Sequence, residues 1–241
     1  MRRSAGVATL ILLLIVAASD TYSQKNVQRD NFLWGTYNLI KPLKGGTKVS
    51  LSAQSRRFIL PDRQHQFKAT ALVTKSLNNG LTIGGGFSYF LQALPIDRNE
   101  VVVVRPELRP HQEISYGSEL GKWMIKHRFM AEERWIRNVV NGDLADDNEF
   151  SMRLRYRLLL ERSLGEESTW SGIISSEAMF NAANSNVNNI FDQNRLYVGL
   201  KNKVSDHISF DVGYIYWYQQ FPSTTDYASF HILNLGVNHT L

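Results

Sequence analysis

Charged and apolar side chains alternate in the segment EFSMRLRYRLLLER, which runs from Glu149 to Arg162. Arg153, Arg155 and Arg157 occupy every second position, and large apolar residues stand between them. Because side chains two positions apart lie on the same face of a β-strand, we expect the three guanidinium groups to form one row. A row of this kind can pair with carboxylates on neighbouring strands, or it can bind anions.

Charged residues recur at alternate positions on both sides of this segment, opposite large apolar residues. We predict that they line the interior of one β-barrel, and the complete set is Arg109, His111, Glu113, Lys126, Arg128, Glu132, Arg134, Glu149, Arg153, Arg155, Arg157, Glu161, Glu177, Arg195, Lys201 and Asp211. Buried charges must be paired or hydrogen-bonded, so we favour arginine–carboxylate pairs that plug a narrow interior. The alternative is that the basic side chains, which outnumber the acidic ones, line a small anion-selective pore.

The same alternation identifies eleven segments as β-strands. Most are long enough to cross a bilayer at a tilt, which takes about 9–11 residues, whereas strands of soluble proteins usually have about 5–6. Short turns such as residues 78–80 (NNG) alternate with longer polar connections such as residues 138–148, as is typical of outer-membrane barrels. Bacterial barrels normally have an even strand number, so we expect about 10–12 strands and favour about 12. The twelfth strand would lie near residues 100–104 or within residues 24–31.

The side of the barrel wall on which the arginine row lies determines which face of the wall contacts lipid. An arginine facing lipid at the bilayer midplane costs about 2–4 kcal/mol, so the row must point inward and the apolar set must meet lipid. An open sheet edge would leave backbone groups unpaired in hydrocarbon, and the strands must therefore close. Trp123 and Trp135 stand near strand ends, where such barrels carry aromatic girdles. The sequence thus predicts an all-β fold, a closed antiparallel transmembrane β-barrel.

The first residues have the pattern of a secretory signal. Arg2 and Arg3 precede the apolar run ATLILLLIVAA at residues 8–18, and small polar residues follow. The run is shorter than the ~20 residues of a membrane span, which disfavours the alternative of an uncleaved anchor. We predict a cleavable signal peptide over residues 1–23 and one outer-membrane β-barrel domain over residues 24–241.

The composition excludes several other classes of protein. The 241 residues include no cysteine, which excludes disulfides and thiolate metal sites. The net charge is +5, but the basic residues are spread along the strands rather than clustered, so we expect no nucleic acid partner. There is no G-x-S-x-G or H-E-x-x-H motif, and the acidic stretch at residues 142–149 fits a solvated loop better than a calcium site. We predict no catalytic residue, no metal and no cofactor.

Several longer motifs resemble one bacterial protein family. They are ELRPHQE (residues 107–113), KHRFMAEERW (126–135), MRLRYRL (152–158), FDQNRLYVGL (191–200) and DVGYIYWYQQ (211–220). On these motifs nearly the whole mature chain resembles the outer-membrane family catalogued as domain of unknown function 2490 (DUF2490), which is common in the Bacteroidetes. The resemblance implies an exported outer-membrane barrel, and it implies no reaction.

We predict an outer-membrane β-barrel protein that is not an enzyme and has a structural or interaction role, with its interior plugged by charge pairs. A small anion-selective porin for acidic solutes is the first alternative, and an outer-membrane lipid-modifying enzyme is the second. The expected partners are outer-membrane lipid and the barrel assembly machinery, joined by small anionic solutes if the porin alternative holds.

Overall fold

The computed structural model describes residues 26–95, 101–183, 189–222 and 225–241, and the predicted signal peptide lies outside them. Most described residues belong to β-strands. The strands are β1 (Asn26–Pro42), β2 (Thr47–Phe58), β3 (Arg63–Ser76), β4 (Leu81–Pro95), β5 (Val101–Leu120), β6 (Trp123–Val140), β7 (Asp143–Ser163), β8 (Trp170–Ala183), β9 (Phe191–Lys203), β10 (Ile208–Gln220) and β11 (Asp226–Thr240). Two short 3-10 helices, η1 (Lys44–Gly46) and η2 (Asn78–Gly80), join β1 to β2 and β3 to β4. Among the described residues, no helix is long and apolar enough to cross a membrane.

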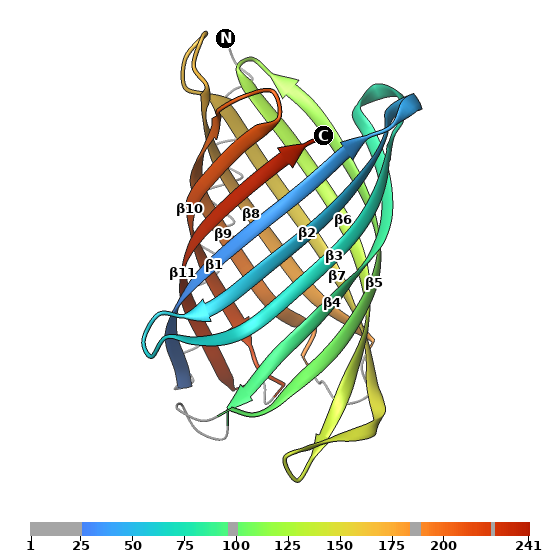
Figure 1. The fold of residues 1–241 in the computed structure, drawn as a ribbon, viewed down its shortest axis with the longest axis vertical. Coiled ribbons are helices and arrows are strands. Elements are labelled where there is room, and N and C mark those ends of the chain that lie inside the picture. The colour runs from blue at the N-terminus through green and yellow to red at the C-terminus, as the bar shows by residue number, and fades with distance from the viewer. Residues whose placement is uncertain (1–25, 96–100, 184–188, 223–224) are drawn as a thin grey trace, which may run out of the picture.

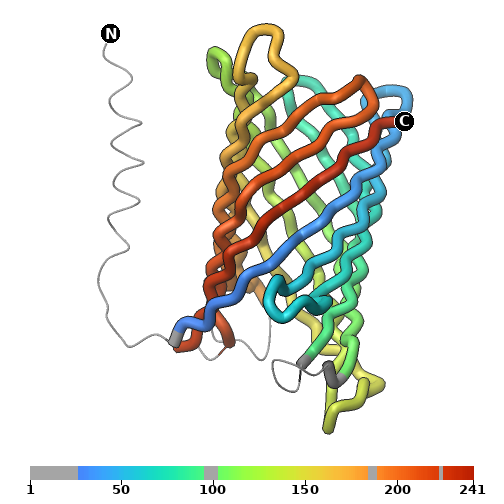
Figure 2. Tube along the Cα trace, turned by 60° about the vertical axis from the view of Figure 1, so that its left-hand side comes forward, coloured from blue at the N-terminus to red at the C-terminus, as the bar shows by residue number. Residues whose placement is uncertain are grey.

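The strands close into one barrel. Each strand pairs with the next in antiparallel fashion. β1 completes the ring by pairing in parallel with β11, from Asn26↔Asp226 to Ile40↔Thr240. Figure 1 shows the tilted strands around the barrel, and Figure 2 shows β1 and β11 side by side. The prediction of a closed all-β barrel is confirmed, except that the closing pair is parallel.

The favoured number of twelve strands is wrong, because the described residues form eleven, which lies within the expected range. The two segments expected to hold a twelfth strand extend strands already counted: residues 101–104 begin β5, and residues 26–31 begin β1. No turn separates these residues from the rest of their strands, so they lengthen existing strands instead of adding one. With an odd number of strands that alternate in direction, the first and the last run the same way, and the closing pair is parallel.

The two ends of the barrel carry different connections. We call the end with η1 and η2 the turn end, and the opposite end, where residues 59–62 join β2 to β3, the loop end. The longer connection predicted over residues 138–148 is wrong, because β6 and β7 continue to the two-residue turn Asn141-Gly142. Both turn residues have positive φ, 53° and 88°, as a type I′ hairpin requires, and Asn-Gly favours this turn. The β6–β7 hairpin therefore projects beyond the neighbouring strands at the loop end (Figure 1).

The two faces of the wall differ in chemistry. The outer face carries large apolar side chains, among them Phe87, Phe129 and Val198, which are 54%, 56% and 53% exposed. The interior face carries charged and polar side chains together with one apolar cluster on β1, β10 and β11. This cluster lies on the interior side of the parallel β1–β11 pair, and we call that strand pair the seam. The cluster comprises Phe32, Trp34, Ile215, Trp217, Ala228, Phe230 and Ile232.

Candidate functional site in the barrel interior

The charged side chains gather inside the barrel. Strand registers place all of the sequence-predicted residues on the interior face, in phase with Arg153 of β7. Arg153 lies opposite Glu132 of β6, and Arg157 lies opposite Glu177 of β8. Charged residues from distant parts of the sequence thus become cross-strand neighbours.

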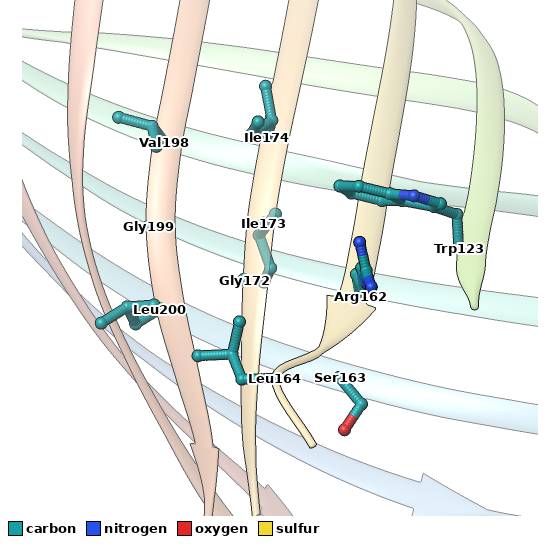
Figure 3. A pocket seen from close by; sticks show the side chains of 10 residues that line it. All are labelled: Trp123, Arg162, Ser163, Leu164, Gly172, Ile173, Ile174, Val198, Gly199 and Leu200. Carbon is teal, nitrogen blue, oxygen red and sulfur yellow. The ribbon is translucent and has the colours of Figure 1, made fainter. Parts of the chain in front are cut away.

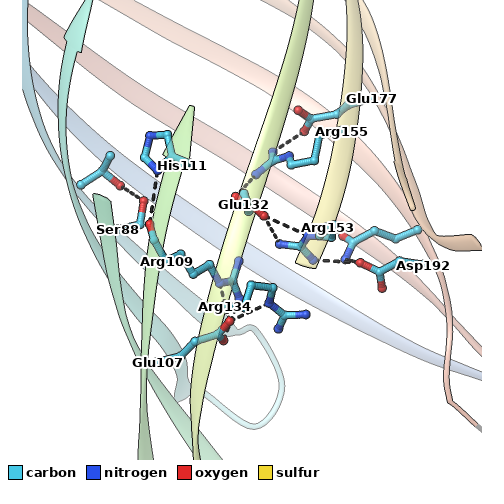
Figure 4. A network of polar contacts seen from close by, with 12 residues as sticks. Ser88, Glu107, Arg109, His111, Glu132, Arg134, Arg153, Arg155, Glu177 and Asp192 are labelled. Atoms are coloured by element: carbon cyan, nitrogen blue, oxygen red, sulfur yellow. Dashed lines mark hydrogen bonds and ion pairs between the residues drawn. The ribbon is translucent and has the colours of Figure 1, made fainter. Parts of the chain in front are cut away.

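A continuous ionic chain runs along β6, β7 and β8 (Figure 4). Glu132 accepts hydrogen bonds from Arg153 Nη2 and Arg155 Nη1, both at 2.6 Å. Arg155 Nη2 then donates to Glu177 at 2.7 Å, and Arg128 Nη2 donates to the other oxygen of Glu177 at 2.5 Å. Each carboxylate therefore joins two guanidinium groups. Only 5% of the Glu132 side chain and 4% of the Arg153 side chain is exposed, so these bonds replace water around the charges.

Two carboxylates that the predicted set does not contain also form ion pairs: Asp192 extends the chain, and Glu107 forms a separate group beside it. Glu107 of β5 accepts hydrogen bonds from Arg109 Nε at 2.6 Å and from Arg134 Nε at 2.7 Å. Asp192 of β9 accepts a hydrogen bond from Arg153 Nη1 at 2.8 Å. Arg153 thus reaches across β8 to β9, and ion pairs cover the interior wall from β5 to β9.

Arg157 differs from its neighbours in the arginine row. It lies opposite Arg128 in the β6–β7 register, so two like charges face each other across the strands. Arg157 has no hydrogen bond or ion pair with any described residue, and its buried Nε atom has no acceptor. The row therefore contains two strongly paired arginines and one unpaired arginine.

The remaining predicted residues make weaker or more local contacts. Lys201 Nζ lies 3.3 Å from Glu161, and Asp211 accepts hydrogen bonds from two asparagines of β11. His111 Nδ1 lies 3.3 Å from the backbone oxygen of Arg109, so its imidazole contacts the main chain rather than Glu113. Within the described part of the chain, no group of three or more His, Cys, Asp or Glu side chains could hold a metal ion.

A second group of interior side chains combines tryptophan and arginine, and of its members only Arg195 belongs to the sequence-predicted set. The guanidinium of Arg56 lies 4.1 Å from the centroid of the Trp34 ring, and that of Arg195 lies 4.6 Å from the Trp217 ring. The two indole rings contact each other edge to face at 5.8 Å. Arg56 also donates hydrogen bonds to the side-chain oxygens of Gln54 and Gln66. These arginines are held by aromatic faces and neutral amides instead of carboxylates.

The interior opens into a cavity of about 810 Å³ at the loop end. Of the residues that the structure describes, seven arginines and three carboxylates line it. The arginines are Arg56, Arg63, Arg105, Arg109, Arg134, Arg153 and Arg195, and the carboxylates are Asp30, Glu149 and Asp192. Phe32, Trp217 and Phe230 of the apolar cluster also line the cavity, which therefore has a cationic and an aromatic part.

The outer face has an apolar groove and three polar pairs of side chains. A groove of about 390 Å³ lies on this face near the turn end. Figure 3 shows the mostly apolar residues that line it, with Trp123 and Arg162 at one side. Three tyrosine–histidine pairs also lie on this face, each joining neighbouring strands. They are Tyr37 with His239, Tyr156 with His127, and Tyr214 with His231.

Comparison with models of known protein families identifies the family of this chain. Residues 31–228 match the family described as protein of unknown function (DUF2490). No curated protein matches the chain significantly.

Proposed function

We propose a function for this chain, which belongs to the DUF2490 family of proteins of unknown function: it is an outer-membrane β-barrel whose interior is closed by charge pairs. Its role is structural or binding rather than catalytic. A cleaved signal peptide over residues 1–23 directs its export, and barrel assembly machinery inserts it into outer-membrane lipid.

The outer face supports the membrane part of the proposal. Phe87, Phe129 and Val198 are all more than half exposed, and an apolar surface of this kind is unfavourable in water. Closure of the sheet pairs the edges of the first and last strands, which hydrocarbon requires. Trp123 and Arg162 face outward near the turn end, as residues of an interfacial girdle do.

The observation that carries the closed interior is the ionic chain through Glu132 and Glu177. Each carboxylate binds two arginines, and Arg153 reaches across β8 to Asp192 of β9. These contacts fill the interior with long side chains whose charged ends are held by one another. In a barrel of this size, such side chains leave little open path.

The anion-selective porin is a second candidate, favoured by the arginines that lack a carboxylate partner among the described residues. Among the described residues Arg195 forms no ion pair, although it lies opposite Glu177 in the β8–β9 register, and Arg157 faces Arg128 across the β6–β7 pair. An excess of positive charge inside a barrel favours the passage of anions if a water-filled path exists.

Single-channel recording separates the two candidates. The mature chain is refolded, inserted into a planar bilayer and recorded in a salt gradient, with insertion verified by protease protection in vesicles of the same lipid. We expect a folded, inserted barrel that stays electrically silent. Steady, anion-selective current steps would refute the closed interior and support the porin. A folded chain that does not insert into the bilayer would refute the proposed membrane location.

A further inference from the structure

We infer that the loop-end cavity binds a small organic anion with a flat apolar body. The inference deepens the proposed function, because it gives the closed interior a ligand. It rests on closure of the interior but does not depend on insertion into a membrane.

The first support is a local excess of positive charge. Three of the seven cavity arginines are neutralised by carboxylates: Glu107 pairs with two of them, and Glu132 and Asp192 pair with the third. The other four form no ion pair with a described residue, and they outnumber the two remaining carboxylates of the cavity, Asp30 and Glu149. These four arginines are Arg56, Arg63, Arg105 and Arg195. Buried charges normally have a counter-charge, so the chemistry that completes this wall is anionic.

The second support is a set of buried hydrogen-bond donors without acceptors. Trp217 is 6% exposed and lines the cavity, and its indole Nε1 has no acceptor among the described residues. The Nε atoms of Arg63, Arg105 and Arg195 are also buried and lack an acceptor within the described part of the chain. Buried polar groups in native proteins are nearly always hydrogen-bonded. A ligand that supplies oxygen acceptors satisfies several of these donors together.

The aromatic part of the cavity defines the body of the ligand. Phe32 and Phe230 contact each other edge to face at 5.2 Å, and Trp217 contacts Phe230 at 4.7 Å. These rings form an apolar wall beside the cationic groups. A hydrated inorganic ion would gain nothing from this wall, whereas an organic anion buries its apolar body there. The volume of about 810 Å³ also suits a small molecule rather than a polymer.

The arrangement of Arg195 and Trp217 identifies where the anionic group lies. The Arg195 guanidinium stands 4.6 Å from the Trp217 ring and 5.3 Å from the Trp34 ring, so two aromatic rings hold it in place. A guanidinium fixed in this way can form charge-assisted hydrogen bonds with a carboxylate or phosphate while the indole contacts the apolar body. Arg195 and Trp217 are therefore the residues to test.

The probe is 1-naphthoate, titrated into the refolded full-length mature chain in detergent micelles by isothermal titration calorimetry. Two matched compounds separate the contributions: 1-naphthamide has the same rings without the charge, and acetate has the charge without the rings. We expect saturable binding of 1-naphthoate and much weaker binding of both controls. Equal binding of naphthoate and naphthamide would overturn the inference, because it would show apolar partition alone.

Two variants test the residues. Arg195→Gln should weaken 1-naphthoate binding about 10- to 100-fold, the range expected from loss of a hydrogen bond to a charged group. Trp217→Phe keeps an aromatic ring but removes the Nε1 donor, and it should weaken binding by a smaller factor. Arg137→Gln is the matched control, because Arg137 pairs with Asp146 on the projecting hairpin and does not line the cavity. If neither cavity variant weakens binding relative to Arg137→Gln, the inference is wrong.

The outcomes are separable from those of the conductance experiment. A silent, inserted barrel that does not bind 1-naphthoate leaves the proposed function standing and overturns the inference. If Arg195→Gln does not fold, as judged from its β-sheet circular dichroism, the comparison of naphthoate with naphthamide and the Trp217→Phe variant still decide the question.

Discussion

Arg155 and Arg157 lie two residues apart on the same face of β7, yet we expect only the replacement of Arg155 by glutamine to lower stability. Arg155 donates to Glu132 at 2.6 Å and to Glu177 at 2.7 Å, so Arg155→Gln removes the link between two buried carboxylates. Arg157 has no ion-pair partner among the described residues and faces Arg128. Arg157→Gln therefore removes the like-charge contact with Arg128 together with the attraction of Glu177 opposite it on β8, and it breaks no hydrogen bond or ion pair between described residues.

The contacts set the size of the expected effects. Removing one partner of a buried ion pair costs about 3–5 kcal/mol. Each carboxylate that loses Arg155 keeps another arginine, Arg153 on Glu132 and Arg128 on Glu177, so we expect the lower end of that range, about 3 kcal/mol. For Arg157→Gln we expect a change between zero and a gain of about 1 kcal/mol, as for relief of like charges that face each other across strands.

The assay is equilibrium unfolding in urea of the refolded chain in detergent micelles, followed by tryptophan fluorescence. For a slope of about 1–3 kcal/mol per molar urea, loss of 3 kcal/mol lowers the midpoint by about 1–3 M. Arg137→Gln is the control, because its partner Asp146 is fully exposed and exposed pairs contribute about 0–1 kcal/mol. Equal shifts for Arg155→Gln and Arg157→Gln, or a larger loss for Arg157→Gln, would refute the account of the ionic chain.

Three further substitutions test other parts of the structure. Phe129→Arg places a charge on the outer face near the middle of β6. If that face meets lipid, the substitution should destabilise the barrel in vesicles by about 2–4 kcal/mol. A change within about 0.5 kcal/mol, as at an ordinary water-exposed position, would contradict the membrane assignment. Trp34→Ala removes a ring that is 3% exposed and should lower the free energy of unfolding in urea by about 3–5 kcal/mol. The control is Trp170→Ala, at a side chain that is 44% exposed. An effect of Trp34→Ala no greater than that of the control would show that the interior cluster contributes little to stability. Gly142→Ala puts a Cβ at φ 88° and should cost more than about 1 kcal/mol locally, seen as faster proteolysis of the β6–β7 hairpin; unchanged proteolysis would argue against the type I′ turn.

Alternation along the chain was sufficient to predict the closed barrel and the interior orientation of the charged row. It was not sufficient for the strand number, because alternation does not tell an added strand from a longer one, as the first residues of β1 and β5 show. It also missed the short connection at residues 141–142, where the polar flanking residues look like a loop. Those residues stay in strands because Arg137 pairs with Asp146 at 2.9 Å and Asn138 with Asp147 at 2.7 Å.

The interior partners were only partly predictable. Arg56 and Glu107 follow the alternation of their strands, so the same rule applied more fully would have included them. Asp192 could not be found in this way, because the β8–β9 register shifts next to it and both Asp192 and Gln193 are buried. Arg195 of β9 contacts Trp217 of the neighbouring β10 and Trp34 of β1, and only closure of the barrel brings β1 near β9.

The seam gives barrel closure the character of a final, cooperative folding step. Asn38 and Asn238 are hydrogen-bonded across it at 2.8 Å although 200 residues separate them in sequence. Every other pair of neighbouring strands is consecutive in sequence and can form as a hairpin, whereas the seam must wait until the whole ribbon has curled. The interior cluster on β1, β10 and β11 is completed only when the barrel closes. Burial of the cluster therefore offsets the loop entropy lost in closure, which is the largest such loss in the fold. A ribbon that stops short of closure presents two unpaired edges, β1 and β11, and each edge is a template for pairing with a second copy of the chain.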